Sequence, residues 1–224
     1  MCDCKAVLFD LDGTLVDTAP DMVGALQQVQ IAAGVEPVSF ADGRAQVSNG
    51  ALGLLHLAFP DQQFQINDPM FCEFINRYAE RVCDDTRLFD GMESILVALE
   101  GADLPWGVVT NKPMHLTVPI IGELRLAHRV ACVVGGDTLP TRKPDPAPMH
   151  FACEQINVAA ADTLYVGDSS RDIEAARAAG MPVIAAAYGY IASDDDPHRW
   201  GADAVVDSTE ELAQMVLKAV NLTA

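Results

Sequence analysis

The chain has 224 residues, half of them hydrophobic, which is enough for one sizeable domain or for a core domain with a smaller insertion. Its formal net charge of −18 repels a phosphate backbone and therefore argues against a nucleic-acid partner. No apolar run reaches the roughly 18 residues of a membrane-spanning helix, so we expect no membrane partner.

The cysteines and the first residues of the chain predict a cytoplasmic protein. The six cysteines are scattered without a C-x-x-C pair, as expected for reduced thiols. The sequence begins Met-Cys-Asp-Cys-Lys and lacks a basic region followed by a long apolar segment and a small-residue cleavage site. We therefore expect no signal peptide.

Short apolar runs alternate with helical patterns along the chain, which predicts an α/β fold with a parallel sheet. The runs are rich in Val, Ile and Ala, as expected for strands covered on both faces. We predict strands within residues 5–10, 104–111, 130–136, 162–168 and 182–188, and a short edge strand that begins at Asp203.

The interval between the first two predicted strands carries almost no strand signal. About 65 residues lie there, which is too long for an ordinary loop. Helical patterns fill the interval over residues 19–34, 42–59 and 68–85. We therefore predict a helical cap domain, residues 18–86, inserted into an α/β core domain formed by residues 1–17 and 87–224.

Further helical patterns follow within the predicted core, over residues 91–102, 170–180 and 208–220. Gly180 fits the left-handed residue that commonly follows the end of a helix. Ser208 or Thr209, followed by acidic residues, fits a capping box at the start of the last helix.

Polar side chains follow the predicted strands at the point where each strand ends. In open α/β sheets, ligands sit outside the carboxyl ends of the strands, so four strands aim carboxylates, hydroxyls and ammonium groups at one edge. These residues are Asp10, Asp12, Thr110, Asn111, Lys112, Lys143, Asp168 and Asp172.

The carboxylates among them predict a magnesium site. Carboxylates gathered in one place repel one another unless a cation neutralises them. Mg²⁺ prefers oxygen ligands and binds one or two carboxylates, waters and a substrate phosphate. We expect Asp10 and Asp168 to be direct ligands and Asp172 to hold a metal-bound water. Lys143 balances the remaining charge between carboxylate and phosphate.

Asp10 and Asp12 are spaced for covalent phosphoryl transfer. Residues i and i+2 of an extended segment lie on one side, so both carboxyl groups can reach one ligand. One can attack phosphorus, and the other can act as general acid and base. Thr110 and Asn111 offer a hydroxyl group and amide donors for phosphate oxygens. A D-x-D pair alone is more often a loop or a helix cap, so the prediction depends on the whole set.

The full set resembles the haloacid dehalogenase superfamily, and specifically its phosphatases. The matching motifs are D-x-D-G-T at residues 10–14, Thr110, Lys143 and GDSSRD at residues 167–172. The resemblance implies a Rossmann-like parallel sheet with an inserted helical cap. It also implies Asp10 as nucleophile, Asp12 as acid and base, and Mg²⁺ held by Asp10, the Asp12 carbonyl and Asp168.

Within that superfamily the chain resembles phosphoglycolate phosphatases and their sister group, the N-acetylmuramic acid 6-phosphate phosphatases. The segment VSNGA, residues 47–51, is similar to a substrate-facing loop of the cap. The resemblance thus implies that Ser48, Asn49 and Gly50 contact substrate, although an ordinary interhelical turn is an equal alternative. The expected partner is a small phosphorylated metabolite, and the sequence leaves a homodimer open.

Three other functions share parts of this pattern. A dehalogenase would use Asp10 but has no need of an acid and base at Asp12. A phosphomutase would use the same residues and return the phosphoryl group to its substrate. A non-catalytic protein that binds a phosphorylated ligand would not need both carboxyl groups. We therefore expect a Mg²⁺-dependent phosphatase that acts through an aspartyl-phosphate.

Overall fold

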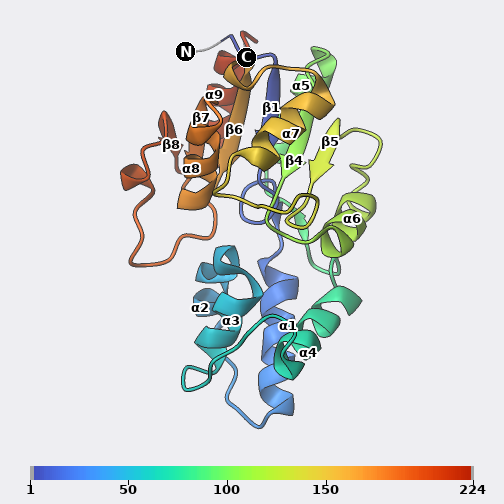
Figure 1. Cartoon of the computed structure of the whole chain (residues 1–224), viewed down its shortest axis with the longest axis vertical. Helices are drawn as coiled ribbons and strands as arrows, with labels where there is room; N and C mark the ends of the chain where they lie inside the picture. The colour runs from blue at the N-terminus through green and yellow to red at the C-terminus, as the bar shows by residue number, and fades with distance from the viewer. Residues whose placement is uncertain (1–2, 223–224) are drawn as a thin grey trace.

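A six-stranded parallel sheet forms the upper part of the molecule in the computed structural model, which describes residues 3–222 (Figure 1). The order across the sheet is β5-β4-β1-β6-β7-β8, and every neighbouring pair is parallel. The strands are β1 (Ala6–Phe9), β4 (Trp106–Val109), β5 (Cys132–Val134), β6 (Thr163–Gly167), β7 (Val183–Ala186) and β8 (Ala204–Val206). The predicted α/β class is confirmed, and each predicted strand region contains an observed strand.

β1 lies in the middle of the sheet, between β4 and β6, and all four of its residues are buried. Its side chains alternate between two hydrophobic clusters, as the pleat of a strand requires. Val7 and Phe9 join one cluster and Leu8 joins the other. Asp10 follows at once, so the central strand delivers a carboxylate to the middle of the carboxyl edge.

Helices cover both faces of the sheet. Residues of α5, α6 and α9 belong to the cluster of Val7, while residues of α7 and α8 belong to the cluster of Leu8. Gly180 has a φ of +76° just beyond α8, which confirms its predicted place. The bounds are α5 (Met92–Gly101), α6 (Met114–Glu123), α7 (Ala147–Ile156), α8 (Ser170–Ala178) and α9 (Thr209–Ala219), with short 3-10 helices η2 (Ala160–Asp162) and η3 (Pro197–Arg199).

A second group of helices lies below the sheet in Figure 1 and packs mainly on itself. It consists of α1 (Ala19–Ala32), α2 (Phe40–Ala45), the 3-10 helix η1 (Val47–Asn49), α3 (Gly50–Ala58) and α4 (Pro69–Glu80). The helical content predicted for this interval is confirmed. The pattern predicted over residues 42–59 is divided, however, because η1 interrupts it and Gly50 adopts a φ of +67°.

A two-stranded antiparallel ribbon joins the two parts of the molecule. β2 (Val16–Asp17) leads into α1, and β3 (Arg87–Leu88) leads back to the core. The ribbon flanks the boundaries predicted for the cap domain at residues 17/18 and 86/87. The division into core and cap stays a prediction, and its outer limits at residues 1 and 224 lie outside the described residues.

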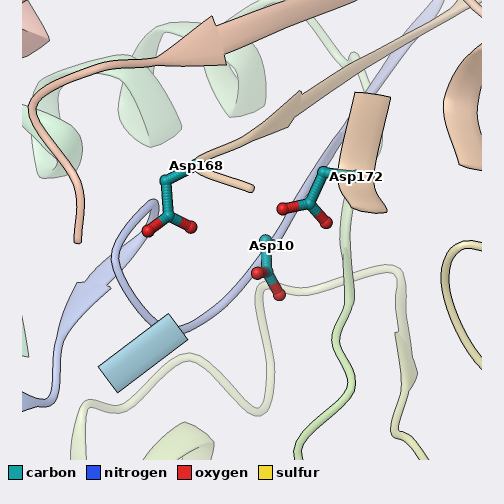
Figure 2. Close-up of side chains that lie close together, drawn as sticks. All are labelled: Asp10, Asp168 and Asp172. Atoms are coloured by element: carbon teal, nitrogen blue, oxygen red, sulfur yellow. The ribbon is translucent and has the colours of Figure 1, made fainter. Parts of the chain in front are cut away.

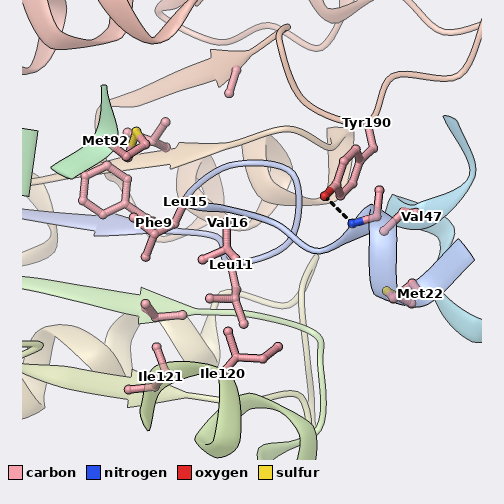
Figure 3. Packing of buried hydrophobic residues seen from close by; sticks show 14 of the residues in the cluster. Phe9, Leu11, Leu15, Val16, Met22, Val47, Met92, Ile120, Ile121 and Tyr190 are labelled. Carbon is pink, nitrogen blue, oxygen red and sulfur yellow. Dashed lines mark hydrogen bonds between the residues drawn. The ribbon is translucent and has the colours of Figure 1, made fainter. Parts of the chain in front are cut away.

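The hydrophobic cluster of Phe9 continues from the sheet into the helical group. Figure 3 shows it extending past Leu11 to Met22 of α1 and Val47 of η1, with Tyr190 beside them. The Tyr190 hydroxyl accepts hydrogen bonds from the Thr18 and Ala19 amides at 2.7 and 2.9 Å. The start of α1 is therefore fixed to the loop that follows β7. Within residues 3–222, no helix is both long and apolar enough to cross a membrane.

Candidate functional site

Three carboxyl groups meet at the carboxyl edge of the sheet (Figure 2). Asp10 follows β1, Asp168 follows β6, and Asp172 lies in the first turn of α8. One oxygen of each lies within 4.8 Å of the corresponding oxygens of the other two. Three residues that the sequence places far apart are thus brought together, as the strand-end argument predicted.

The position of Asp172 is set by the start of α8. Ser169 is the N-cap residue, and its backbone amide donates to Asp172 Oδ2 at 3.0 Å in a capping box. Such a cap contributes about 1 kcal/mol to helix stability. The same contact fixes one oxygen of the carboxylate and leaves Oδ1 directed at Lys143, which lies 2.6 Å away. Asp172 therefore combines a helix-capping contact with a place in the acidic site.

Asp168 is buried and receives three hydrogen bonds. Thr14 Oγ1 donates to Oδ1 at 3.1 Å, while Ser48 Oγ and the Tyr190 amide donate to Oδ2 at 2.8 and 2.9 Å. Burial and the neighbouring Asp172 raise the pKa of Asp168 to about 6, although these hydrogen bonds oppose the shift.

Two glycines make room for the Asp168 side chain. A Cβ atom on Gly13 would lie 2.1 Å from Asp168 Oδ2, and one on Gly189 would lie 2.4 Å from Asp168 Cβ. Gly13 also adopts a φ of +85°, which other residues rarely adopt. The glycine of the D-x-D-G-T motif is therefore required both by its backbone conformation and by the close approach of Asp168.

Asp10 is held through one of its two oxygens. The Leu11 amide donates to Oδ1 at 2.7 Å, and Lys143 Nζ lies 3.0 Å from the same atom. No hydrogen bond from residues 3–222 reaches Oδ2. Burial raises the pKa of Asp10 to about 8, with Lys143 opposing the shift and the neighbouring carboxylates adding to it. This carboxylate therefore lacks full compensation of its charge.

Lys143 forms ion pairs with both Asp10 and Asp172. Its Nζ atom lies 2.6 Å from Asp172 Oδ1, 2.8 Å from the Val109 carbonyl and 2.9 Å from the Tyr165 hydroxyl. Burial lowers the pKa of Lys143, but Asp10 and Asp172 outweigh burial, so the pKa is raised overall. The ammonium group stays charged next to the two carboxylates, at the position that the sequence predicted for it.

Asp12 is not one of the three clustered carboxylates. Its Oδ1 accepts hydrogen bonds from Thr18 Oγ1 at 2.5 Å and from Lys112 Nζ at 2.8 Å. Among the described residues, the carboxyl groups that lie close enough to share an ion are those of Asp10, Asp168 and Asp172, without that of Asp12. The resemblance assigns only its backbone carbonyl to the metal, so its side chain is available for another purpose.

Thr110 and Asn111 occupy the loop after β4. Thr110 Oγ1 accepts a hydrogen bond from the Lys112 amide at 3.1 Å, which leaves its own proton available to donate. Asn111 Nδ2 donates to the Lys143 carbonyl at 2.9 Å, while its buried Oδ1 has no hydrogen-bond partner in the described chain. The structure thus places Asn111 against Lys143, and Thr110 directly after the end of β4.

Of the three cap residues that the resemblance suggests, Ser48 reaches the acidic site. Its hydroxyl contacts Asp168, and its carbonyl accepts a hydrogen bond from Arg171 at 2.6 Å. Asn49 instead donates to Gln46 at 2.9 Å within the helical group, and Gly50 begins α3. The described structure therefore connects η1 to the site through Ser48 and Arg171.

Sequence reasoning missed two tyrosines of this region. Tyr165 lies within β6 and extends its hydroxyl to Lys143, and the backbone amide of Tyr190 supports Asp168. Tyr165 looked like one more apolar strand residue, because nothing local distinguishes a tyrosine that reaches a buried lysine. The signal available for Tyr165 was that a buried tyrosine needs a partner for its hydroxyl. Tyr190 acts on Asp168 through its backbone amide, which no side-chain pattern reports.

Comparisons with known proteins agree with this geometry. The family model of haloacid dehalogenase-like hydrolases matches residues 7–186. A phosphoglycolate phosphatase of Xanthomonas campestris pv. campestris (strain 8004) is 44% identical over 208 residues, covering 93% of this chain and 94% of that protein. An N-acetylmuramic acid 6-phosphate phosphatase of Pseudomonas aeruginosa is 42% identical over 217 residues, covering 96% of each.

A similar solved structure comes from Haemophilus somnus 129PT. It is described as a predicted phosphoglycolate phosphatase, and it matches with a TM-score of 0.83 at 27% identity. The match covers 96% of this chain and 99% of that one. Sheet and helical group are thus shared over nearly the whole length.

Proposed function

This chain belongs to the haloacid dehalogenase-like hydrolase family and is a phosphatase of that family, and from this we propose that it hydrolyses the phosphate monoester of a small metabolite through an aspartyl-phosphate on Asp10. The observation that carries the mechanism is the asymmetry of the Asp10 carboxylate. Oδ1 is held by the Leu11 amide and Lys143, while Oδ2 accepts no hydrogen bond from the described residues. An oxygen in that state is free to attack.

The proposed reaction has two steps. Asp10 Oδ2 forms a bond to phosphorus as the ester bond to the leaving oxygen breaks, and Asp12 gives that oxygen its proton. Water then attacks the phosphorus and gives a proton to Asp12. The bond between phosphorus and Asp10 breaks, which releases inorganic phosphate and restores both carboxyl groups. The net reaction consumes one water and yields an alcohol and phosphate.

We propose Mg²⁺ as the cofactor, because the donor set fits it. The carboxylate oxygens lie within 4.8 Å of one another. Burial and, to a smaller extent, the neighbouring carboxylates raise the pKa of Asp10, and a cation would offset both effects. Asp10, Asp168 and the Asp12 carbonyl would be the direct ligands. Asp172 is already paired with Lys143, which suits contact with the ion through a water. When bound, the ion would neutralise charge on the transferring phosphoryl group.

Thr110, Asn111 and Lys143 are the proposed phosphate contacts. The proton of the Thr110 hydroxyl and the second amide hydrogen of Asn111 are not used in the described hydrogen bonds. Positive charge on Lys143 would stabilise the phosphoryl group electrostatically. Ser48, Asn49 and Gly50 are the proposed contacts of the cap with the rest of the substrate, and Ser48 has the strongest support because it already touches Asp168.

The proposed substrate is a phosphate monoester such as 2-phosphoglycolate or N-acetylmuramic acid 6-phosphate. The names of the two relatives at 44% and 42% identity support these choices. A cytoplasmic location remains part of the proposal. The direct test measures release of inorganic phosphate from each ester by the purified protein with Mg²⁺. Conversion without phosphate release would indicate a phosphomutase instead, and binding without turnover would indicate a non-catalytic protein.

Asp10→Asn should reduce phosphate release below detection, because an amide is not a competent nucleophile at phosphorus. Removal of divalent cations with a chelator should do the same, and added Mg²⁺ should restore activity. Asp194→Asn is the matched control, since Asp194 is exposed and does not belong to the clustered acids Asp10, Asp168 and Asp172. Substantial turnover by Asp10→Asn would contradict the aspartyl-phosphate, and turnover in chelator would contradict the metal.

A further inference from the structure

We infer that Lys112 is a positioning residue for the acid and base Asp12, and that Tyr78 of α4 holds this lysine in place. The inference rests on the proposed function and adds to it a residue that lies outside the motif set. It follows from the surroundings of one buried ammonium group.

Lys112 carries a positive charge into the interior of the protein. Its side chain is 5% exposed, and Nζ lies 2.8 Å from Asp12 Oδ1. A buried ammonium group requires an opposite charge and good hydrogen-bond geometry. Within residues 3–222, Asp12 is the acid that forms an ion pair with it. The side chain is therefore directed by Asp12 and, in turn, restricts the orientation of Asp12.

The contacts of Asp12 are distributed unequally between its oxygens. Oδ1 accepts from both Thr18 and Lys112, while no donor from the described chain reaches Oδ2. The oxygen that exchanges a proton with the leaving group is therefore Oδ2. Two donors on Oδ1 fix the plane of the carboxyl group, so that Oδ2 keeps one direction.

Tyr78 covers the other side of the lysine. It belongs to α4, is 1% exposed, and places its ring centroid 4.6 Å from Lys112 Nζ. The face of an aromatic ring attracts a cation, and more strongly where water is excluded. Met22 of α1 completes the surroundings, with its sulfur 3.9 Å from Nζ. The helical group below the sheet therefore contributes to the placement of the proton donor.

The leaving group of the substrate reveals whether Lys112 acts through Asp12. An alkoxide is a poor leaving group and needs a proton as it departs, whereas 4-nitrophenolate departs readily without one. The quantity kcat/KM includes the steps up to phosphorylation of Asp10 and excludes the later hydrolysis. A defect in the positioned acid should therefore lower kcat/KM for an alkyl phosphate more than for 4-nitrophenyl phosphate.

The test compares Lys112→Met with the wild type on two esters. One is 4-nitrophenyl phosphate, and the other is whichever of 2-phosphoglycolate and N-acetylmuramic acid 6-phosphate the wild type hydrolyses faster. We expect kcat/KM for the alkyl ester to fall about 100-fold, and the ratio of alkyl to aryl kcat/KM to fall at least about 10-fold. Equal losses on the two esters, or no loss on either, would overturn the inference.

Two further variants distinguish the proposed role from a general loss of folding. Tyr78→Leu removes the ring but leaves Lys112, so the ratio of alkyl to aryl kcat/KM should fall by a smaller factor than in Lys112→Met. An unchanged ratio would overturn the part of the inference that concerns Tyr78. Lys218→Met, in the exposed last turn of α9, is the matched control and should keep the wild-type ratio. A wild-type protein inactive on all three esters would overturn the proposed function itself, and this inference with it.

Discussion

At the scale of single residues, the hydroxyl of Tyr165 next to the acidic site can be removed by substitution without changing the rest of the side chain. It accepts a hydrogen bond from Lys143 at 2.9 Å, and burial raises its pKa well above the ordinary value, so it stays protonated. Tyr165→Phe keeps the ring and removes the hydroxyl, which also lies 2.9 Å from the Val109 carbonyl and 3.2 Å from Asp172 Oδ1. We expect kcat/KM to fall about 5- to 10-fold, since a buried hydrogen bond contributes about 1 kcal/mol or slightly more.

Tyr188→Phe is the matched control for that measurement. Its hydroxyl donates to the Thr14 carbonyl at 2.9 Å and touches none of the clustered acids. It should lower the melting temperature by a comparable amount and leave kcat/KM nearly unchanged. If the two variants lose activity equally, the hydroxyl of Tyr165 has only a structural role.

The motif residues could be predicted because the carboxyl ends of parallel strands meet at one edge. This rule correctly groups Asp10, Asp168 and Lys143 without any knowledge of distances. The rule cannot predict the ion pair between Lys112 and Asp12 or the contact of Lys112 with the Tyr78 ring. The contact with Tyr78 depends on how a separate group of helices packs against the sheet. No periodicity in the sequence reports such packing between elements.

At the scale of elements, Asp21 joins the start of α1 to the segment that follows α4. It is fully buried and accepts hydrogen bonds from the amide and hydroxyl of Thr86, each at 2.8 Å, while Arg81 lies 3.2 Å away. Asp21→Ala would leave these donors unpaired. We expect it to lower the free energy of unfolding by about 3–5 kcal/mol, measured by urea denaturation.

Asp85→Ala provides the comparison for Asp21. Asp85 pairs with the same Arg81 at 3.5 Å, but its side chain is 66% exposed. An exposed pair contributes at most about 1 kcal/mol. If Asp21→Ala and Asp85→Ala lower the free energy of unfolding by similar amounts, the burial of Asp21 does not account for its contribution to stability.

Most elements of at least one helical turn or one buried strand could be predicted, although α6 and α7 were not, whereas the shortest elements could not. β2 and β3 contain two residues each, which is too few for an alternating pattern. η1 is likewise hidden within a longer apolar pattern, because a three-residue turn does not change the periodicity around it. These short elements are nevertheless the ones that position Ser48 and the entry to α1.

At the scale of the whole molecule, the clustered acids make stability depend on pH. The pKa of Asp10 rises from 3.8 to about 8 on folding, so the metal-free folded state binds this proton more tightly than the unfolded state does. Stability from this group is fully present below pH 3.8 and is lost as the pH rises towards 8. Asp168, with a pKa of about 6, acts in the same direction.

We therefore expect the metal-free protein to unfold at lower urea concentration at pH 8 than at pH 5, with a smaller difference in Asp10→Asn. Mg²⁺ should stabilise the protein at pH 8 by about 2.7 kcal/mol when its concentration is 100 times its dissociation constant. The measurement is urea denaturation at both pH values, in chelator and in Mg²⁺. A metal-free protein that is more stable at pH 8, with the same slope in Asp10→Asn, would contradict the assignment.

The fold class could be predicted as a whole because alternating apolar runs and helical patterns allow few arrangements other than a parallel sheet covered on both faces. The contacts that hold the helical group against the sheet, such as those of Tyr190 with the start of α1, could not be predicted. Those contacts join residues more than one hundred positions apart, and local patterns carry no record of them.

The two glycines beside Asp168 limit how this enzyme can change during evolution. Even a methyl group would overlap the Asp168 side chain, at its carboxylate from Gly13 and at its Cβ atom from Gly189. A change of substrate specificity therefore cannot arise from larger side chains at Gly13 or Gly189. Changes in the substrate that is accepted would have to come from the helical group, which brings Ser48 to Asp168 from a separate part of the chain.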